Sequence, residues 1–145
     1  MVHAVVADRH QRGRPMLSDD DRVLLHGKNF ASLATTMADG SPQASIVWID
    51  VDDDTILVNT AEGRTKTANM RRDPRVAICL FESADPYRQL MVRGRVTDFV
   101  HDGADAHIDA LAKKYTGADV YGDHRADQQR VIVRIVADAV ARMGY

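Results

Sequence analysis

The chain has very little of several features that define whole classes of protein. Its single cysteine, Cys79, excludes an intramolecular disulfide. This residue lies in the apolar run VAICLF, where a thiol usually packs as a small hydrophobic side chain. No apolar run is long enough to cross a bilayer, and the N-terminal stretch has no signal-peptide core or cleavage site. The sequence therefore predicts a cytoplasmic protein with no membrane partner.

An excess of positive charge and the spacing of metal ligands are also missing. The 19 Lys and Arg residues and 21 Asp and Glu residues give a formal net charge of −2, so no affinity for nucleic acid is expected. The six histidines are scattered without zinc-ligand spacing, and the acidic run DVDDDT lacks the glycine and distal glutamate of a calcium loop. We expect no metal site, and no constellation of side chains identifies a catalytic residue.

What is present is the composition of one ordinary globular domain. The chain has 145 residues, of which 45% are hydrophobic and 28% charged, enough for a single compact core. Residues 1–16 include Gly13 and Pro15 and follow no hydrophobic period, so we interpret them as a flexible N-terminal arm. Residues 17–145 are predicted to form one domain.

Helix and strand signals follow one another in an order that favours a β-barrel. Helices are predicted from Ser18 to Gly27, after Gly63 to about Arg72, and from the acidic DGADAH stretch to Gly117. Strands are predicted in FASLATTM, PQASIVWIDV, TILVNT, RVAICLFES, QLMVRGRVTDFV and QQRVIVRIVADAVARMGY. Six strands with mostly adjacent antiparallel connections predict a mainly β (α+β) fold that closes into a small barrel with a few short helices.

Two strands carry more specific expectations. RVAICLFES is apolar at nearly every position, which predicts burial on both faces. Gly94, inside QLMVRGRVTDFV, is expected to mark a bulge or a close approach of the backbone. Because a barrel of this size fills its interior with side chains, a large ligand is expected outside it or at a subunit junction.

The stretch from Asn59 to Pro74 leads into a concentration of positive charge. Arg71, Arg72 and Arg75 lie near the end of the predicted helix, where the helix dipole favours cations and a solvated surface is sufficient explanation. Arg64 and Lys66 lie at the start of the helix, where the dipole disfavours cations, so a bound anion is the natural compensation.

The residues around Arg64 and Lys66 favour a phosphate as that anion. Gly63 lets the backbone come close, the first N–H groups of the helix point outward, and Thr65 and Thr67 add hydroxyl donors. The spacing is not that of a Walker motif or a Gly-x-Gly fingerprint. The stretch therefore predicts a phosphate cradle without identifying the ligand.

The run ILVNTAEGRTKTANMRRDPRVAI, set after the hairpin ATTMADGSPQASIVWID, resembles the flavin and deazaflavin split-barrel oxidoreductases. This is the pyridoxamine-phosphate-oxidase-like family, and the closer match is its actinobacterial branch, which uses coenzyme F420. The resemblance covers roughly residues 18–137. It implies a six-stranded antiparallel split β-barrel of the FMN-binding type, with a site shared between the two barrels of a homodimer. It also implies that reduced F420 transfers a hydride to a small electron-poor organic substrate.

The resemblance further implies which residues contact the cofactor. Phosphate contacts are expected from Arg64, Thr65 and Lys66, with support from Asn69, while the strand PQASIVWID lies along the ring system. Trp48 is either part of that cofactor wall or a core aromatic. The expected cofactor-binding residues of the first subunit are Gln43, Ser45, Val47, Trp48, Asn59, Thr60, Gly63, Arg64, Thr65, Lys66 and Asn69. Those of the second subunit are Tyr87, Arg88, Arg125 and Gln129.

Other functions stay open at this stage. An FMN-dependent oxidase or reductase would use the same cradle. A non-catalytic cofactor-binding or haem-binding protein would reuse the barrel, although haem calls for a well-placed axial histidine. F420 carries a polyglutamate tail beyond its phosphate, and Arg71, Arg72 and Arg75 extend the basic track toward it. The terminus VADAVARMGY lacks the Arg-Leu-x-Pro-like end of the oxidases proper, so pyridoxamine phosphate is not the expected substrate.

Overall fold

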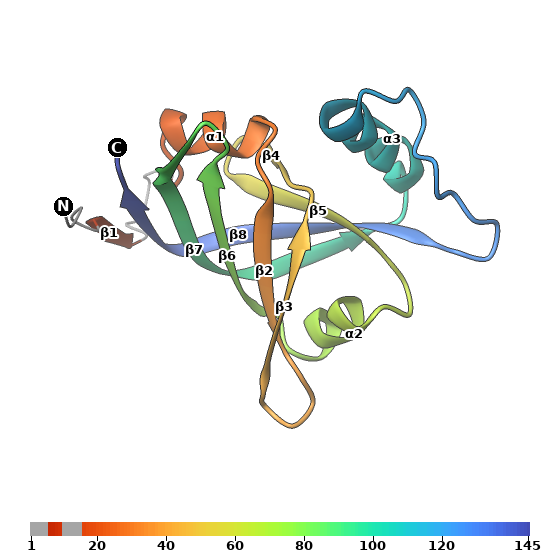
Figure 1. Cartoon of the computed structure of the whole chain (residues 1–145). Helices are drawn as coiled ribbons and strands as arrows, with labels where there is room; N and C mark the ends of the chain where they lie inside the picture. The colour runs from red at the N-terminus through yellow and green to blue at the C-terminus, as the bar shows by residue number, and fades with distance from the viewer. Residues whose placement is uncertain (1–5, 10–15) are drawn as a thin grey trace.

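The computed structural model of the chain describes residues 6–9 and 16–145 (Figure 1). Its strands form one antiparallel sheet in the order β3-β2-β6-β7-β8-β5-β4, and β1 pairs with β8. The strands are β1 (Val6–Arg9), β2 (Ala31–Thr36), β3 (Pro42–Val47), β4 (Asp50–Asp52), β5 (Thr55–Ala61), β6 (Arg75–Glu82), β7 (Asp85–Val100) and β8 (Arg130–Met143). The helices are α1 (Asp19–His26), α2 (Thr65–Arg72) and α3 (Ala104–Thr116).

The mainly β prediction is confirmed, but the described chain has more strands than the six expected. The run PQASIVWIDV divides after Val47 into β3 and the short β4. Residues Val6–Arg9, predicted to belong to a flexible arm, form β1. Residues 1–5 and 10–15 of that arm lie outside the described part of the chain. The core lies on the concave side of the sheet and includes Leu33, Ile56, Leu80, Leu90 and Ile135, each at most 1% exposed.

The three helices begin and end where the sequence predicts. The hydroxyl of Ser18 accepts a hydrogen bond from the Asp21 backbone N–H, and the Asp21 carboxylate accepts one from the Ser18 N–H, which makes a capping box. The buried Asp21 carboxylate also accepts from Arg142 and from the Tyr145 hydroxyl, which fixes the last strand to α1. α3 ends at Gly117, whose φ is +80°. No helix of the described residues is long and apolar enough to cross a membrane.

Gly94 marks both a bulge and a close approach, as predicted. The register between β7 and β8 shifts between Arg93 and Gly94. A Cβ at Gly94 would lie 2.2 Å from the backbone oxygen of Val136, so no larger residue fits without moving the backbone. The bulge allows the long β7 to bend and continue along β8 around the barrel.

The prediction that β6 is buried on both faces is wrong for a single chain. Val76, Ile78 and Leu80 face the core and are at most 6% exposed. Cys79 is exposed and Phe81 is 49% exposed, because no other part of the described chain covers that face. The apolar residues of this face therefore lie on the outer surface of the sheet.

Candidate functional site

A pocket opens where the sheet is not closed by hydrogen bonds, in the gap beside β3. Its volume is about 180 Å³. In the view of Figure 1, the two helices that contribute to the pocket lie apart, α2 toward the bottom and α3 toward the top right. The pocket is lined by β3 and the residue after it, by β5, by the start of α2, by α3 and by the segment that enters β8. The lining residues are Ile46, Val47, Trp48, Asn59, Arg64, Lys66, Ile108, Tyr121 and Arg130, and we refer to it as the cationic pocket.

Three cations share the cationic pocket without an acidic partner. Arg130 is 5% exposed, Lys66 is half-buried, and Arg64 lies at the rim. Within residues 6–9 and 16–145, Arg64, Lys66 and Arg130 take part in none of the ion pairs. Burial, followed by repulsion from Arg64 and Arg130, lowers the pKa of Lys66. Burial and the charge of Arg64 likewise lower the pKa of Arg130. A bound anion would offset this unfavourable electrostatic energy.

The turn from β5 into α2 positions two of these cations. Gly63 has φ of +86°, which only glycine adopts readily, and a Cβ there would meet nothing within 4 Å. Gly63 therefore allows a sharp turn rather than a close backbone approach. Arg64 is the N-cap residue of α2 but makes no side-chain cap, and the first turn contains no acid. The first N–H groups of α2 are left without a capping side chain, which suits an anion.

Some of the predicted cradle residues support the turn and do not line the pocket. Thr67 is fully buried and its hydroxyl donates to the Ala61 carbonyl at 2.8 Å, so the prediction of a hydroxyl donor here is wrong. Thr60 is 1% exposed and contacts the Thr67 hydroxyl at 3.1 Å. Asn69 is buried and donates to the Thr35 hydroxyl, which ties α2 to β2. Thr65 is exposed at the first position of α2, outside the pocket lining.

Of the β3 residues that the resemblance implies, Val47 lines the pocket and Ser45 contacts a lining side chain. Lys66 Nζ donates to the Ser45 hydroxyl at 3.1 Å, which connects α2 to β3 across the gap. Gln43 accepts a hydrogen bond from Thr35 and does not line the pocket. The Trp48 ring stacks on Tyr115 of α3, with ring centroids 5.2 Å apart and planes within 5°. Trp48 is therefore an aromatic packed against α3 that also forms part of the pocket wall.

Sequence reasoning missed four residues of the lining, Ile46, Ile108, Tyr121 and Arg130. Arg130 begins β8, and the pairing of β5 with β8 places it opposite Ala61, just before the turn at Gly63. Its only sequence signal is a charged residue at the head of an apolar strand. Ile46 is 67% exposed, an unusual position for isoleucine at the edge of a sheet.

The four residues expected from a second subunit do not line the pocket of their own chain. Tyr87 is 62% exposed at the start of β7. Arg88 pairs with Glu82 at 2.9 Å and lies over the Tyr145 ring. Arg125 pairs with Asp123, and Gln129 is exposed next to the start of β8. A contribution of these residues from a partner chain stays a prediction.

The rest of the basic track has partners within the chain. Arg71 pairs with Glu62 and lies 4.2 Å from the centre of the Phe99 ring. Arg75 pairs with Asp73 at 2.7 Å, and this partner lowers the pKa of Asp73 to about 2. Arg72 donates to the backbone oxygen of Thr36. These contacts agree with the solvated-helix-end interpretation of the three arginines.

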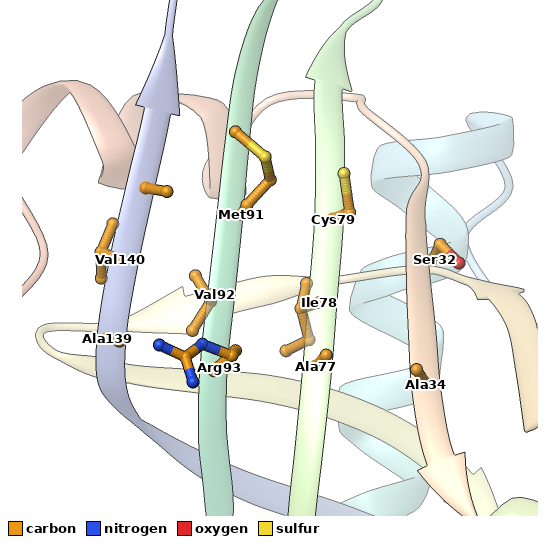
Figure 2. Close-up of a pocket in the computed structure, with 11 residues that line it drawn as sticks. Ser32, Ala34, Ala77, Ile78, Cys79, Met91, Val92, Arg93, Ala139 and Val140 are labelled. Atoms are coloured by element: carbon orange, nitrogen blue, oxygen red, sulfur yellow. The ribbon is translucent and has the colours of Figure 1, made fainter. Parts of the chain in front are cut away.

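A second surface lies on the outer side of the sheet, where a hollow of about 340 Å³ runs across β2, β6, β7 and β8. Figure 2 shows its residues on these neighbouring strands. The strand registers align two rows of residues on this side, which we call the outer face. One row is Ile46, Ser32, Cys79, Met91 and Ala141, and the other is Ala44, Ala34, Ala77, Arg93 and Ala139. Ile46 belongs both to the outer face and to the lining of the cationic pocket, so the two surfaces are continuous.

A single antiparallel sheet with a gap, and a cluster of unpaired cations at a strand-to-helix turn in that gap, define a split barrel of the flavin-binding class. Residues 17–144 match the family described as pyridoxamine 5'-phosphate oxidase, and the chain belongs to this family. The split-barrel prediction is thereby confirmed. Members of this family are generally oxidoreductases that bind flavin-type cofactors.

Solved structures agree with this assignment. One named F420 reductase is 29% identical, with 82% of this chain and 94% of that chain covered and a TM-score of 0.74. A conserved hypothetical protein from Mycobacterium tuberculosis is 27% identical, with 92% and 89% covered and a TM-score of 0.68. A FAD-binding protein from Mesorhizobium loti is 20% identical, with 97% and 99% covered and a TM-score of 0.64, and shows the shared fold alone.

Proposed function

We propose that the protein is an F420-dependent reductase that acts as a homodimer and binds the cofactor phosphate through Arg64 and Lys66. The observation that carries this proposal is the cluster of cations without acidic partners at the start of α2. The family assignment supports a flavin-type cofactor. The 29% identity to a protein named F420 reductase favours the deazaflavin over FMN.

The residues around the pocket fit both parts of such a cofactor. The cations and the uncapped N–H groups of α2 suit a phosphate. The side chains of Ile46, Val47 and Trp48 form an apolar wall that suits a planar ring. When bound, reduced F420 supplies a hydride to an electron-poor carbon of the substrate. The chain's own part is to hold the phosphate, orient the ring against β3 and exclude water from one side of it.

The size of the pocket and the apolar outer face support the proposal of a homodimer. The volume of about 180 Å³ is below the roughly 300–1,000 Å³ of typical small-molecule sites. The outer face is apolar and continues into the pocket at Ile46. A second copy seated on this face would bury the exposed side of β6 and add walls to the pocket, which accounts for a strand that is apolar on both sides.

The test is titration of F420 against the double variant Arg64→Ala, Lys66→Ala, with quenching of cofactor fluorescence as the signal. We expect micromolar binding by the parent and a loss of at least about tenfold in the variant, or about 1.4 kcal/mol. The matched control is Lys113→Ala, Arg134→Ala, which also removes two cations, but ones paired with Asp119 and Asp52. Equal F420 affinity in the parent and the Arg64→Ala, Lys66→Ala variant would refute the assignment of the phosphate site.

The family description also supports FMN as a second candidate cofactor. The two are separated by a panel of FMN, FAD, F420 and haem, read by thermal shift and absorbance. A ligand that binds the folded state raises the melting temperature, whereas a ligand that does not bind leaves it unchanged. A yellow purified protein stabilised by FMN but not by F420 would replace the F420 proposal with the FMN alternative.

A further inference from the structure

Arg130 is a buried arginine whose hydrogen-bond partners are all neutral. Its side chain lies in the cationic pocket, and the residue is 5% exposed. Nε donates to Asn59 Oδ1 at 2.9 Å and Nη1 donates to Gln128 Oε1 at 3.3 Å. The guanidinium carbon lies 5.3 Å from the centre of the Tyr121 ring. Nη2 has no hydrogen-bond partner among the described residues, so one end of the guanidinium is available to a ligand.

The orientation of the Asn59 amide is determined by its other two contacts. Nδ2 lies 2.9 Å from the Ala104 backbone oxygen and 3.0 Å from His107 Nδ1. Because a carbonyl oxygen can only accept, the amide nitrogen must face Ala104. Oδ1 is then turned toward Arg130, whose Nε can only donate. The contacts therefore allow a single arrangement of this amide.

The same logic fixes the tautomer of His107. Since Asn59 Nδ2 donates to it, Nδ1 carries no proton, and the proton of the neutral ring is on Nε2. Burial lowers the pKa of His107, Lys114 and Arg130 lower it further, and Asp50 opposes them. A proton on Nδ1 would face the Asn59 N–H groups, so the amide would have to rotate and Arg130 would lose its acceptor. The position of Arg130 thus depends on a neutral His107.

We propose that Arg130 is a third phosphate contact of the cationic pocket, positioned by Asn59 and, behind it, His107, and that this contact selects the phosphorylated cofactor over its dephosphorylated form. The proposal rests on the proposed function, because the phosphate is that of the cofactor. Arg130 is the binding residue here, whereas Asn59 and His107 act through it as positioning residues. A guanidinium offers a planar pair of donors to a phosphate, which a lysine does not.

The test compares each phosphorylated cofactor with a matching ligand that lacks the phosphate. These are FMN against riboflavin, and F420 against its deazaflavin chromophore without phosphate and tail. For Arg130→Met we expect the affinity for the phosphorylated form to fall at least about tenfold, with the affinity for the other form unchanged within about twofold. Arg134→Met is the control, since Arg134 lies on the same strand but pairs with Asp52. Equal losses for both forms, or no loss at all, would overturn the proposal and leave the proposed function standing.

A measurement without any cofactor tests the case in which the proposed function fails and the phosphate contact holds. Inorganic phosphate should raise the melting temperature of the parent, and Arg130→Met should reduce this rise. A parent that binds no flavin or deazaflavin but shows this Arg130-dependent rise would refute the proposed function and support the phosphate contact. A phosphate effect that is the same in parent and variant would overturn the contact.

The positioning roles have their own readout. Asn59→Leu removes the acceptor and keeps the volume, so phosphate selectivity should fall by about threefold or more with riboflavin affinity unchanged. His107→Asn keeps an acceptor near the Nδ1 position but cannot gain a proton. F420 carries a phosphate diester, which does not titrate between pH 5.5 and 8 (roughly the stable range). The F420 selectivity of the parent should therefore fall as the pH is lowered below about 6.5, while that of His107→Asn stays flat. Identical pH profiles in parent and variant would overturn the role of His107.

Discussion

The cationic pocket and the outer face are opposite in chemistry although they share Ile46. The pocket gathers three cations whose partners are neutral, while the outer face has a single charge, Arg93, among its ten aligned residues. In a single chain, both surfaces are energetically unfavourable. Among the described residues, the cationic pocket has no negative charge to balance its cations, and the outer face has no apolar surface to cover it. We infer that the two needs are met together, by a cofactor and by a second copy of the chain.

The largest effect is expected where a charge is placed on the outer face. Met91→Glu puts a carboxylate between Cys79 and Ala141, two residues along β7 from Arg93 on the same face. A partner copy would have to bury this carboxylate, at a cost of several kcal/mol or about a hundredfold or more in dimer affinity. We expect a monomer in analytical ultracentrifugation, loss of F420 reductase activity, and faster labelling of the Cys79 thiol than in the parent.

The matched control for Met91→Glu is Thr97→Glu, which adds the same charge at an exposed position of β7 outside the outer face. This variant should stay a dimer with unchanged activity. A dimeric, active Met91→Glu variant would show that the outer face is not the interface. A fully active monomer would show that the site does not need a second chain.

The next effect is expected in the cationic pocket, where one substitution should weaken F420 binding without lowering the stability of the protein. Lys66→Met removes one of three mutually repelling cations, and among residues 6–9 and 16–145 it gives up the hydrogen bond to the Ser45 hydroxyl. We expect F420 affinity to fall about tenfold, while the melting temperature without ligand stays the same or rises. The measurement is a pair of thermal melts with and without F420. A clear fall in the ligand-free melting temperature would mean that Lys66 stabilises the fold and that the cluster is not strained.

The sequence predicted those parts of the site that come from one continuous stretch. Arg64 and Lys66 were identified because they contradict the helix dipole, and that local signal needs no tertiary structure. Arg130 was missed because its place in the pocket depends on the pairing of β5 with β8. Thr67 was assigned to the cradle wrongly, since the rotation of α2 turns its hydroxyl into the core.

The fold shows the same division between local and long-range information. The helix caps at Ser18 and Gly117 are local and were predicted correctly. The apolar pattern of β6 predicted two buried faces, but a pattern cannot tell which molecule provides the cover. The split between β3 and β4 was missed because both lie in one apolar run.

A smaller effect is expected at the glycine that turns the chain into the pocket. Gly63→Ala places a side chain at φ of +86°, with free space around it, so the cost is backbone strain of about 1 kcal/mol. Chemical denaturation should show this loss, together with a weaker affinity for F420 because the start of α2 shifts. Gly40→Ala is the control, with the same φ of +86° and the same free space in the turn between β2 and β3, outside the pocket lining, and should leave F420 affinity unchanged. An unchanged affinity in Gly63→Ala would separate the turn from the phosphate site.

The smallest effect is a pH dependence of the free energy of unfolding, which comes from His107 beside the cationic pocket. The pKa of His107 is lowered in the folded protein, so between that value and about 6.5 the unfolded chain binds more protons than the folded one. The free energy of unfolding contributed by His107 is therefore complete above about pH 6.5 and falls with decreasing pH, by at most about 1.4 kcal/mol per pH unit. In denaturation curves from pH 7.5 to 5 (roughly), His107→Asn should lose less stability than the parent. Equal slopes would mean that His107 titrates in the folded protein as it does in the unfolded chain, and that its protonation does not disturb the network that holds Arg130.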